Sequence, residues 1–149
     1  MVKIIGYGNP FRKDDAIGLW IVARLKYLWR PPKDRVSFWL GHQLLPELAL
    51  WISDADMAIF IDSSLKVEDR KGWTFMEISP KDTLAHNMFH SIDVGGILSL
   101  CKSEYDRCPK SFLLAVMGYD FSYGAGLTER AKKASYEAIE FLKEFLFHK

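Results

Sequence analysis

The sequence has no strong bias of charge, no long apolar run and only two cysteines, and each absence excludes a class of protein. Lys and Arg number 20 against 19 Asp and Glu, which gives a net charge of +1. This balance provides no basic excess for nucleic acid and no acidic solvating tail. No apolar run approaches the roughly 20 residues that span a membrane, and the apolar N-terminus is too short for a signal peptide. We therefore expect a cytoplasmic protein with no nucleic-acid partner and no membrane segment.

The two cysteines, Cys101 and Cys108, are too few for a disulfide framework and lack the spacing of zinc ligands. We expect Cys101 to be a core thiol on a helix and Cys108 to be a loop thiol. Hydrophobic residues at 49% and aromatic residues at 14% are sufficient for a sizeable core, which excludes disorder of the whole chain. A length of 149 residues then favours a single domain, 1–149.

Strand and helix patterns alternate along the chain. Apolar runs bounded by turn residues predict strands, and apolar residues at helical spacing predict helices. The Met57–Ile61 run is continuously apolar, as in a central parallel strand, whereas Trp73–Ile78 alternates like an edge strand. The other predicted strands are Lys3–Tyr7, Val36–Leu40 and Ser111–Met117; the predicted helices follow Asp14, begin at Pro46, cover Val94–Cys101 and follow Thr128.

Two of these helices have identifiable ends. Asp14 is expected to cap the first helix, whose apolar stripe is predicted to extend to Leu28 before Pro31-Pro32 ends it. Thr128 is expected to cap the last helix, and its stripe ends with Phe145.

This order of elements predicts an α/β fold, a three-layer α/β/α domain with a mostly parallel sheet of about five strands. In such folds, ligands collect at the carboxyl ends of the strands. The segments expected there are Gly8–Asp15, Asp62–Ser64, the loop before Val94 and the glycine-rich loop Gly118–Gly126. Candidate functional residues are therefore sought in these four segments.

The first segment contains a glycine turn, Gly6–Pro10, followed by the pair Asp14 and Asp15. A dinucleotide-binding turn needs a third glycine and a helix N-terminus left free for pyrophosphate, and here two carboxylates would repel phosphate. If both residues are structural, Asp14 caps the helix and Asp15 complements the helix dipole. Because one carboxylate already satisfies the cap, Asp15 is the better candidate for chemistry.

The second candidate, Asp62, ends the strand that begins at Met57 and would face the crevice at the strand ends. Its structural alternative is a turn residue beside Ser63 and Ser64. Neither serine has the glycine context of a nucleophile elbow, so serine catalysis is rejected.

Histidines supply the third candidate. His86 and His90 are four residues apart, a spacing that presents two nitrogens to one metal only if the segment is helical. His90 lies just before the predicted helix at Val94 and could point into the crevice. A hydrogen-bonded loop residue is the alternative for either histidine, and also for His42.

Asp15, Asp62 and His90 would together form a site of two carboxylates and one imidazole. Such ligands suit nickel, zinc or manganese, and geometry rather than affinity selects among these metals. Three protein ligands leave room for water or a substrate group.

These residues lie in motifs that resemble those of the hydrogenase maturation proteases. The opening motif is Gly-x-Gly-Asn-Pro followed by two acidic residues and glycine, here Gly6–Gly18, with Ala16 in place of the usual glycine. An apolar strand ending in Asp-Ala is matched by Ile59–Ser63, with serine in place of alanine. A histidine before a leucine-bearing helix is matched by His90, and a late glycine loop by Gly118–Thr128. The stretch His42–Leu48 is also similar to one found in a branch of that family.

The resemblance covers nearly the whole chain and implies an activity. Proteases of this family remove a C-terminal extension from the large-subunit precursor of a nickel–iron hydrogenase after nickel has been inserted. The positions thought to contact that nickel correspond to Asp15, Asp62 and His90, and His86 is the alternative to His90. No permanent cofactor is then expected, because nickel arrives with the substrate, although zinc or cadmium could occupy the site. Whether a carboxylate also activates water is left open.

Two other functions use the same sequence features. A metal-checking or assembly module could bind the hydrogenase precursor through the same three residues without cutting it. A flavodoxin-like nucleotide binder would share the alternation of strands and helices, but Asp14 and Asp15 argue against it.

Overall fold

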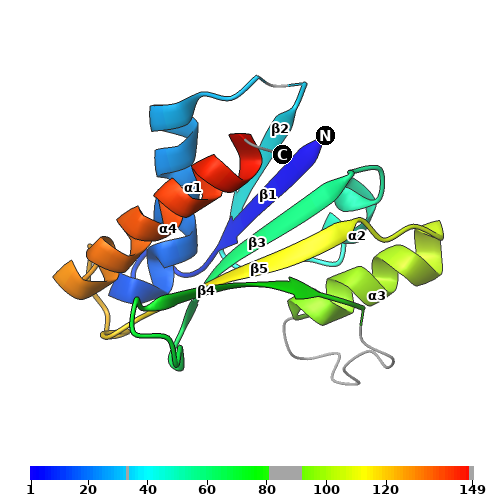
Figure 1. Cartoon of the computed structure of the whole chain (residues 1–149). Coiled ribbons are helices and arrows are strands. Elements are labelled where there is room, and N and C mark those ends of the chain that lie inside the picture. Colours follow the sequence, from blue (N-terminus) through cyan, green and yellow to red (C-terminus); the bar gives the residue numbers. More distant parts are fainter. Residues whose placement is uncertain (33, 81–91, 148–149) are drawn as a thin grey trace.

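The computed structural model describes residues 1–32, 34–80 and 92–147 (Figure 1). Its five strands form one sheet in the order β2-β1-β3-β5-β4. β4 pairs antiparallel with β5 at one edge, and the other pairings are parallel. The strands are β1 (Val2–Tyr7), β2 (Val36–Gly41), β3 (Met57–Ser64), β4 (Trp73–Ile78) and β5 (Lys110–Met117). The predicted order of elements and the mostly parallel five-stranded sheet are confirmed.

The helices cover both faces of this sheet. The 3-10 turn η1 (Lys13–Ala16) leads into α1 (Ile17–Arg24), which continues into the π-helical turn η2 (Leu25–Trp29). The remaining helices are α2 (Leu48–Ile52), α3 (Val94–Tyr105) and α4 (Glu129–Phe147). α1 and α4 share one buried cluster with the sheet, and α2 and α3 share the other (Figure 1). The three-layer α/β/α arrangement follows from these two clusters.

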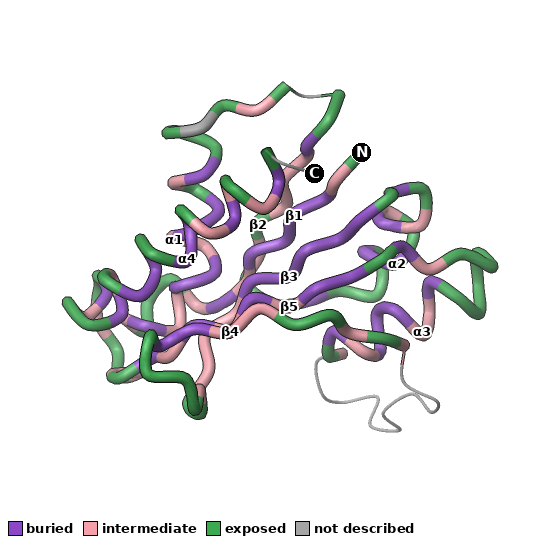
Figure 2. Tube along the Cα trace, in the orientation of Figure 1, coloured by how far each residue is buried: buried purple, intermediate pink, exposed green. Residues whose placement is uncertain are grey.

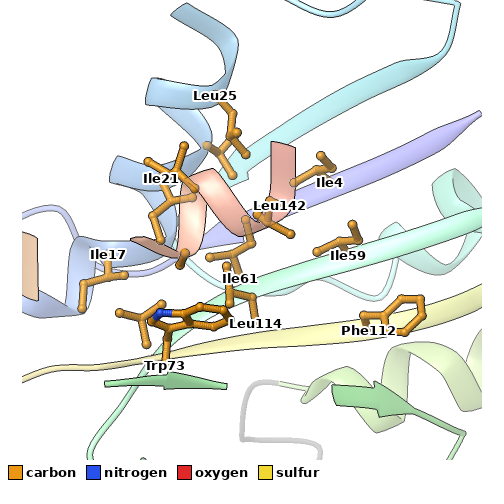
Figure 3. Close-up of a cluster of buried hydrophobic side chains, with 14 of the residues drawn as sticks. Ile4, Ile17, Ile21, Leu25, Ile59, Ile61, Trp73, Phe112, Leu114 and Leu142 are labelled. Atoms are coloured by element: carbon orange, nitrogen blue, oxygen red, sulfur yellow. The ribbon is translucent and has the colours of Figure 1, made fainter. Parts of the chain in front are cut away.

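β3 lies at the centre because its side chains are apolar toward both layers. Ile59 and Ile61 join the cluster under α1 and α4, whereas Ala58 and Phe60 join the cluster under α2 and α3. Figure 3 shows Ile59 and Ile61 packed among side chains from α1, α4, β1 and β5. Figure 2 shows that β1 and β3 are buried along most of their length. A strand covered on both faces needs a continuous apolar run, which explains the Met57–Ile61 pattern.

Three local expectations can be compared with the structure. Thr128 caps α4, since its Oγ1 accepts a hydrogen bond from the Ala131 N–H at 3.2 Å. Leu28 does not belong to the buried stripe of the first helix, because the π-helical turn changes the spacing of side chains; 54% of Leu28 is exposed. Asp14 does not cap the first helix, since neither η1 nor α1 has a side-chain cap.

The cysteines lie where the sequence predicts them. Cys101 is buried on α3, and Cys108 is a partly buried thiol in the loop before β5. Within the described ranges, no helix is long and apolar enough to cross a membrane.

Candidate functional site

The carboxyl ends of β1 and β3 lie side by side and carry the two predicted acidic residues. Asp15 belongs to η1, in the connection that leaves β1, and Asp62 is the third residue from the end of β3. In the parallel register between these strands, Gly6 faces Ile61. The next residues along each strand, Tyr7 and Asp62, are therefore neighbours on the layer side of α2 and α3.

Asp62 is held by the hydroxyl of Tyr7. The Tyr7 Oη donates a hydrogen bond to Asp62 Oδ2 at 3.0 Å. Burial raises the pKa of Asp62 to about 6, and the negative charge of Asp15 adds to this rise. The hydrogen bonds from Tyr7 and from the Ser63 backbone oppose the increase. Asp62 is therefore a carboxylate that keeps its proton to a higher pH than an exposed aspartate does.

Asp15 is tied to both strand ends. Its Oδ2 accepts a hydrogen bond from the Asn9 N–H at 2.9 Å, and its Oδ1 accepts a longer one from Ser63 Oγ at 3.4 Å. The charge of Asp15 acts on Asp62, which shows that the two carboxylates lie near each other at the strand ends. Their assignment as metal contacts and catalytic groups stays a prediction.

Two glycines of the opening motif permit this close approach. A Cβ atom at Gly8, whose φ is +149°, would lie 1.9 Å from the backbone oxygen of Asp15. A Cβ atom at Gly18 would lie 2.4 Å from the backbone oxygen of Ile61. The glycines thus bring η1 and α1 against the strand ends. Ala16, which replaces the family's usual glycine, has φ −87° and ψ 6°, a backbone conformation that needs no glycine.

Asp14 has a different role from its neighbour Asp15. Its side chain is completely buried, and its carboxyl group accepts hydrogen bonds from the backbone N–H groups of Tyr119 and Asp120 at 2.8 and 3.2 Å. It also accepts hydrogen bonds from the N–H and the Oγ1 of Thr128, both at 2.8 Å. Asp14 therefore fastens the 118–128 loop and the start of α4 to η1.

The histidine assignments lie outside the described residues. His86 and His90 fall in the undescribed segment 81–91. The described chain resumes before Asp93, which caps α3 by accepting a hydrogen bond from the Gly96 N–H at 2.8 Å. Among the described residues, no three His, Cys, Asp or Glu side chains are grouped closely enough to hold a metal ion.

Several solved structures are similar to the chain over nearly its whole length. HycI, a NiFe hydrogenase maturation protease from Thermococcus kodakarensis, superposes with a TM-score of 0.72 at 22% identity, covering 97% of this chain and 91% of its own. The hydrogenase maturating endopeptidase HybD from E. coli gives a TM-score of 0.75 at 20% identity, with 99% and 92% covered. A hydrogenase 2 maturation peptidase from a Thaumarchaeota archaeon gives 0.70 at 21% identity, with 97% of each chain covered.

The chain has the fold of the hydrogenase maturation proteases. The predicted fold class is thus confirmed by solved structures. The sequence matches no family model and no curated protein, so the likeness rests on the fold. In this maturation-protease fold, Asp15 and Asp62 lie at the carboxyl ends of adjacent parallel strands, where α/β folds usually bind ligands.

Sequence reasoning missed two features of the site. Tyr7 is predicted at the end of a strand and in the glycine turn, with no functional role, although a buried tyrosine has a polar group that needs a partner. The second feature is an apolar depression of about 350 Å³ beside the Asn9 backbone that binds Asp15. The sequence signal for this depression was Phe11, an aromatic residue in a polar loop, and the structure shows that it is 71% exposed. The depression is lined by Asn9, Pro10, Phe11, Leu19, Leu40, Gly41 and His42.

Proposed function

We propose that the chain is an endopeptidase that removes the C-terminal extension of a nickel–iron hydrogenase large-subunit precursor after nickel insertion. The observation that carries this proposal is the pairing of Asp15 and Asp62 at the carboxyl ends of β1 and β3, in a chain with the maturation-protease fold. The neighbouring structures are named as proteases or endopeptidases of hydrogenase maturation. The protein is expected to act in the cytoplasm, where its precursor would be assembled.

The nickel of the precursor would be recognised as part of the substrate. Asp15 and Asp62 offer carboxylate oxygens, and His90 is proposed as the third contact from its place in the sequence motif. Two carboxylates and one imidazole include no thiolate, so they form a weak and open site compared with a closed structural metal cage. Thiolates from the precursor would complete the coordination. The enzyme would then need no permanent cofactor, and added zinc or cadmium would occupy the site only at high concentration.

Asp62 is the better placed general base. An effective base has a pKa near the working pH, and burial brings the pKa of Asp62 to about 6. At pH 7 its carboxylate is mostly ionised and can accept a proton from the attacking water. The nickel of the substrate would polarise the scissile carbonyl. The apolar depression next to Asn9 offers a surface for the chain that flanks the cut.

The rate of cleavage should follow the ionisation of the Asp62 carboxyl group as the pH changes. Because the pKa of Asp62 is about 6, kcat/KM should rise as pH increases from 5 to 7 and then reach a plateau. The measurement is kcat/KM for nickel-loaded precursor across this range, with the nickel content of the precursor checked at each pH. A flat profile with nickel retained would show that ionisation of Asp62 is not required.

Nickel should determine whether the precursor is cut. Nickel-loaded and nickel-free precursor are incubated with the purified protein, and products are identified by intact mass. We expect cleavage of the loaded form alone, because the empty form lacks the contact that joins substrate and enzyme. Metal analysis of protein purified without added metal is the control and should show little bound metal. Equal cleavage of both forms, or tightly bound stoichiometric zinc, would indicate an ordinary protease instead.

The same assay separates the alternative functions. A metal-checking module would form a complex with loaded precursor but release it uncut. A nucleotide binder would be stabilised by nucleotide or flavin in a thermal-shift measurement, which the carboxylate of Asp15 at the strand ends argues against.

A further inference from the structure

Tyr7 lies beside Asp62 and has no role in the proposed chemistry so far. Its backbone is part of β1, and Gly41 of β2 lies opposite in the parallel register. Its ring packs against the buried cluster under α2 and α3. A side chain held at both its backbone and its ring can present its hydroxyl in only a narrow range of positions. In this structure the hydroxyl meets Asp62 Oδ2 at 3.0 Å.

The Tyr7 hydroxyl is the donor in this contact. An ionised carboxylate can only accept hydrogen bonds, so the proton between Tyr7 Oη and Asp62 Oδ2 comes from the tyrosine. The hydroxyl of Tyr7 therefore binds one defined oxygen of Asp62.

We propose that Tyr7 is a positioning residue that fixes the orientation of the Asp62 carboxylate toward the substrate. This inference rests on the proposed function of the site. Within the described chain, Asp62 accepts hydrogen bonds from the hydroxyl of Tyr7 and from the backbone of Ser63. Without the hydroxyl, the carboxylate could rotate, and fewer encounters would present its oxygen to the substrate's metal and water. Correct orientation of a reacting group affects the chemical step more than substrate binding.

The matched contact at Asp15 is weaker. Ser63 Oγ lies 3.4 Å from Asp15 Oδ1, a long distance for a hydroxyl donor, whereas the Asn9 N–H binds the other oxygen at 2.9 Å. Asp15 is therefore fixed mainly by backbone, and Asp62 mainly by a side chain. A single substitution at Tyr7 can therefore remove the hydrogen bond that orients Asp62, which makes the proposal testable.

The test is Tyr7→Phe, which keeps the ring and removes only the hydroxyl. We expect kcat for nickel-loaded precursor to fall about tenfold, equal to about 1.4 kcal/mol of transition-state stabilisation, with KM changed less than twofold. Tyr136→Phe is the matched control: Tyr136 is 44% exposed on α4, where its ring contacts Trp20 of α1. This layer lies on the other side of the sheet from the ring of Tyr7. Tyr136→Phe should leave both constants unchanged.

A second readout follows the carboxylate itself. The carboxyl carbon resonance of Asp62, measured by NMR at a pH above 8, should shift in Tyr7→Phe and stay unchanged in Tyr136→Phe. A wild-type kcat in Tyr7→Phe would overturn the positioning role, even if the resonance shifts. An unshifted resonance would overturn the hydrogen bond on which the proposal depends. If the wild-type protein does not cut the precursor, the proposed protease function fails, and the resonance then decides by itself whether Tyr7 holds this carboxylate.

Discussion

Asp62→Asn is expected to abolish cleavage while leaving the protein folded and more stable at neutral pH. The asparagine keeps the shape of the side chain and can still accept the Tyr7 hydrogen bond through its amide oxygen. It cannot act as a base or supply a charged oxygen to nickel, so kcat should fall about 10³-fold. Cleavage of nickel-loaded precursor, followed by intact mass, measures the loss.

The gain in stability has a defined sign and pH range. Burial and the charge of Asp15 raise the pKa of Asp62 to about 6, so the folded protein binds this proton more tightly than the unfolded chain does. The contribution of Asp62 to stability is therefore most favourable below pH 4 and is lost as the pH rises through 6. Asp62→Asn should raise the free energy of unfolding by roughly 1–3 kcal/mol at pH 7 and by much less at pH 4. Urea denaturation at the two pH values would measure this difference.

Asp15→Asn is the companion variant. It should also abolish cleavage without unfolding the protein, since the Asn9 N–H can donate to the amide oxygen. Normal cleavage by either variant would place the active site elsewhere. Unfolding of either variant would show that the carboxylate is structural.

Asp14→Ala is expected to produce the largest loss of stability. The substitution removes the acceptor of four hydrogen bonds. Their donors are the backbone N–H groups of Tyr119, Asp120 and Thr128 and the hydroxyl of Thr128. These partly buried donors would lose a charged acceptor, so the free energy of unfolding should fall by about 3–5 kcal/mol. The 118–128 loop would no longer be fastened to η1. Cleavage should then be lost through unfolding.

Asp15→Ala is the matched control for this prediction, because it makes the same chemical change one residue along the chain. Asp15 is only partly buried and accepts one short and one long hydrogen bond. We expect it to remain folded at the temperature at which Asp14→Ala unfolds. Urea denaturation followed by circular dichroism compares the two. Equal stability of both variants would mean that the hydrogen bonds of Asp14 contribute little.

Local sequence patterns were sufficient to predict the order of the elements. Met57–Ile61 can be apolar throughout only where a strand is covered on both faces, and β3 is that strand. Trp73–Ile78 alternates because β4 lies at the edge of the sheet. Thr128 was recognised as a cap because its partner, Ala131, is three residues away. Each of these signals depends on residues close together in the sequence.

Local patterns failed where the geometry changed or the partner was distant. Leu28 was predicted to be buried on the assumption of 3.6 residues per turn. That assumption fails because η2 is a π-helical turn with a different spacing. Asp14 was assigned a local cap, yet its partners lie 105 to 114 residues further along the chain. No property of the neighbouring sequence indicates a hydrogen bond of that range.

The sequence by itself determined the fold class and the placement of Asp15 and Asp62 at strand ends, because period and turn residues encode local backbone geometry. The tertiary structure decided which of the two adjacent aspartates is enclosed and which stays partly exposed. Asp14 is enclosed by the 118–128 loop, whereas Asp15 turns toward the end of β3. It also decided that Tyr7 holds Asp62 and that burial raises the pKa of that carboxyl. Burial and hydrogen-bond partners are set by strands and loops that are distant in the chain and meet only in the folded protein.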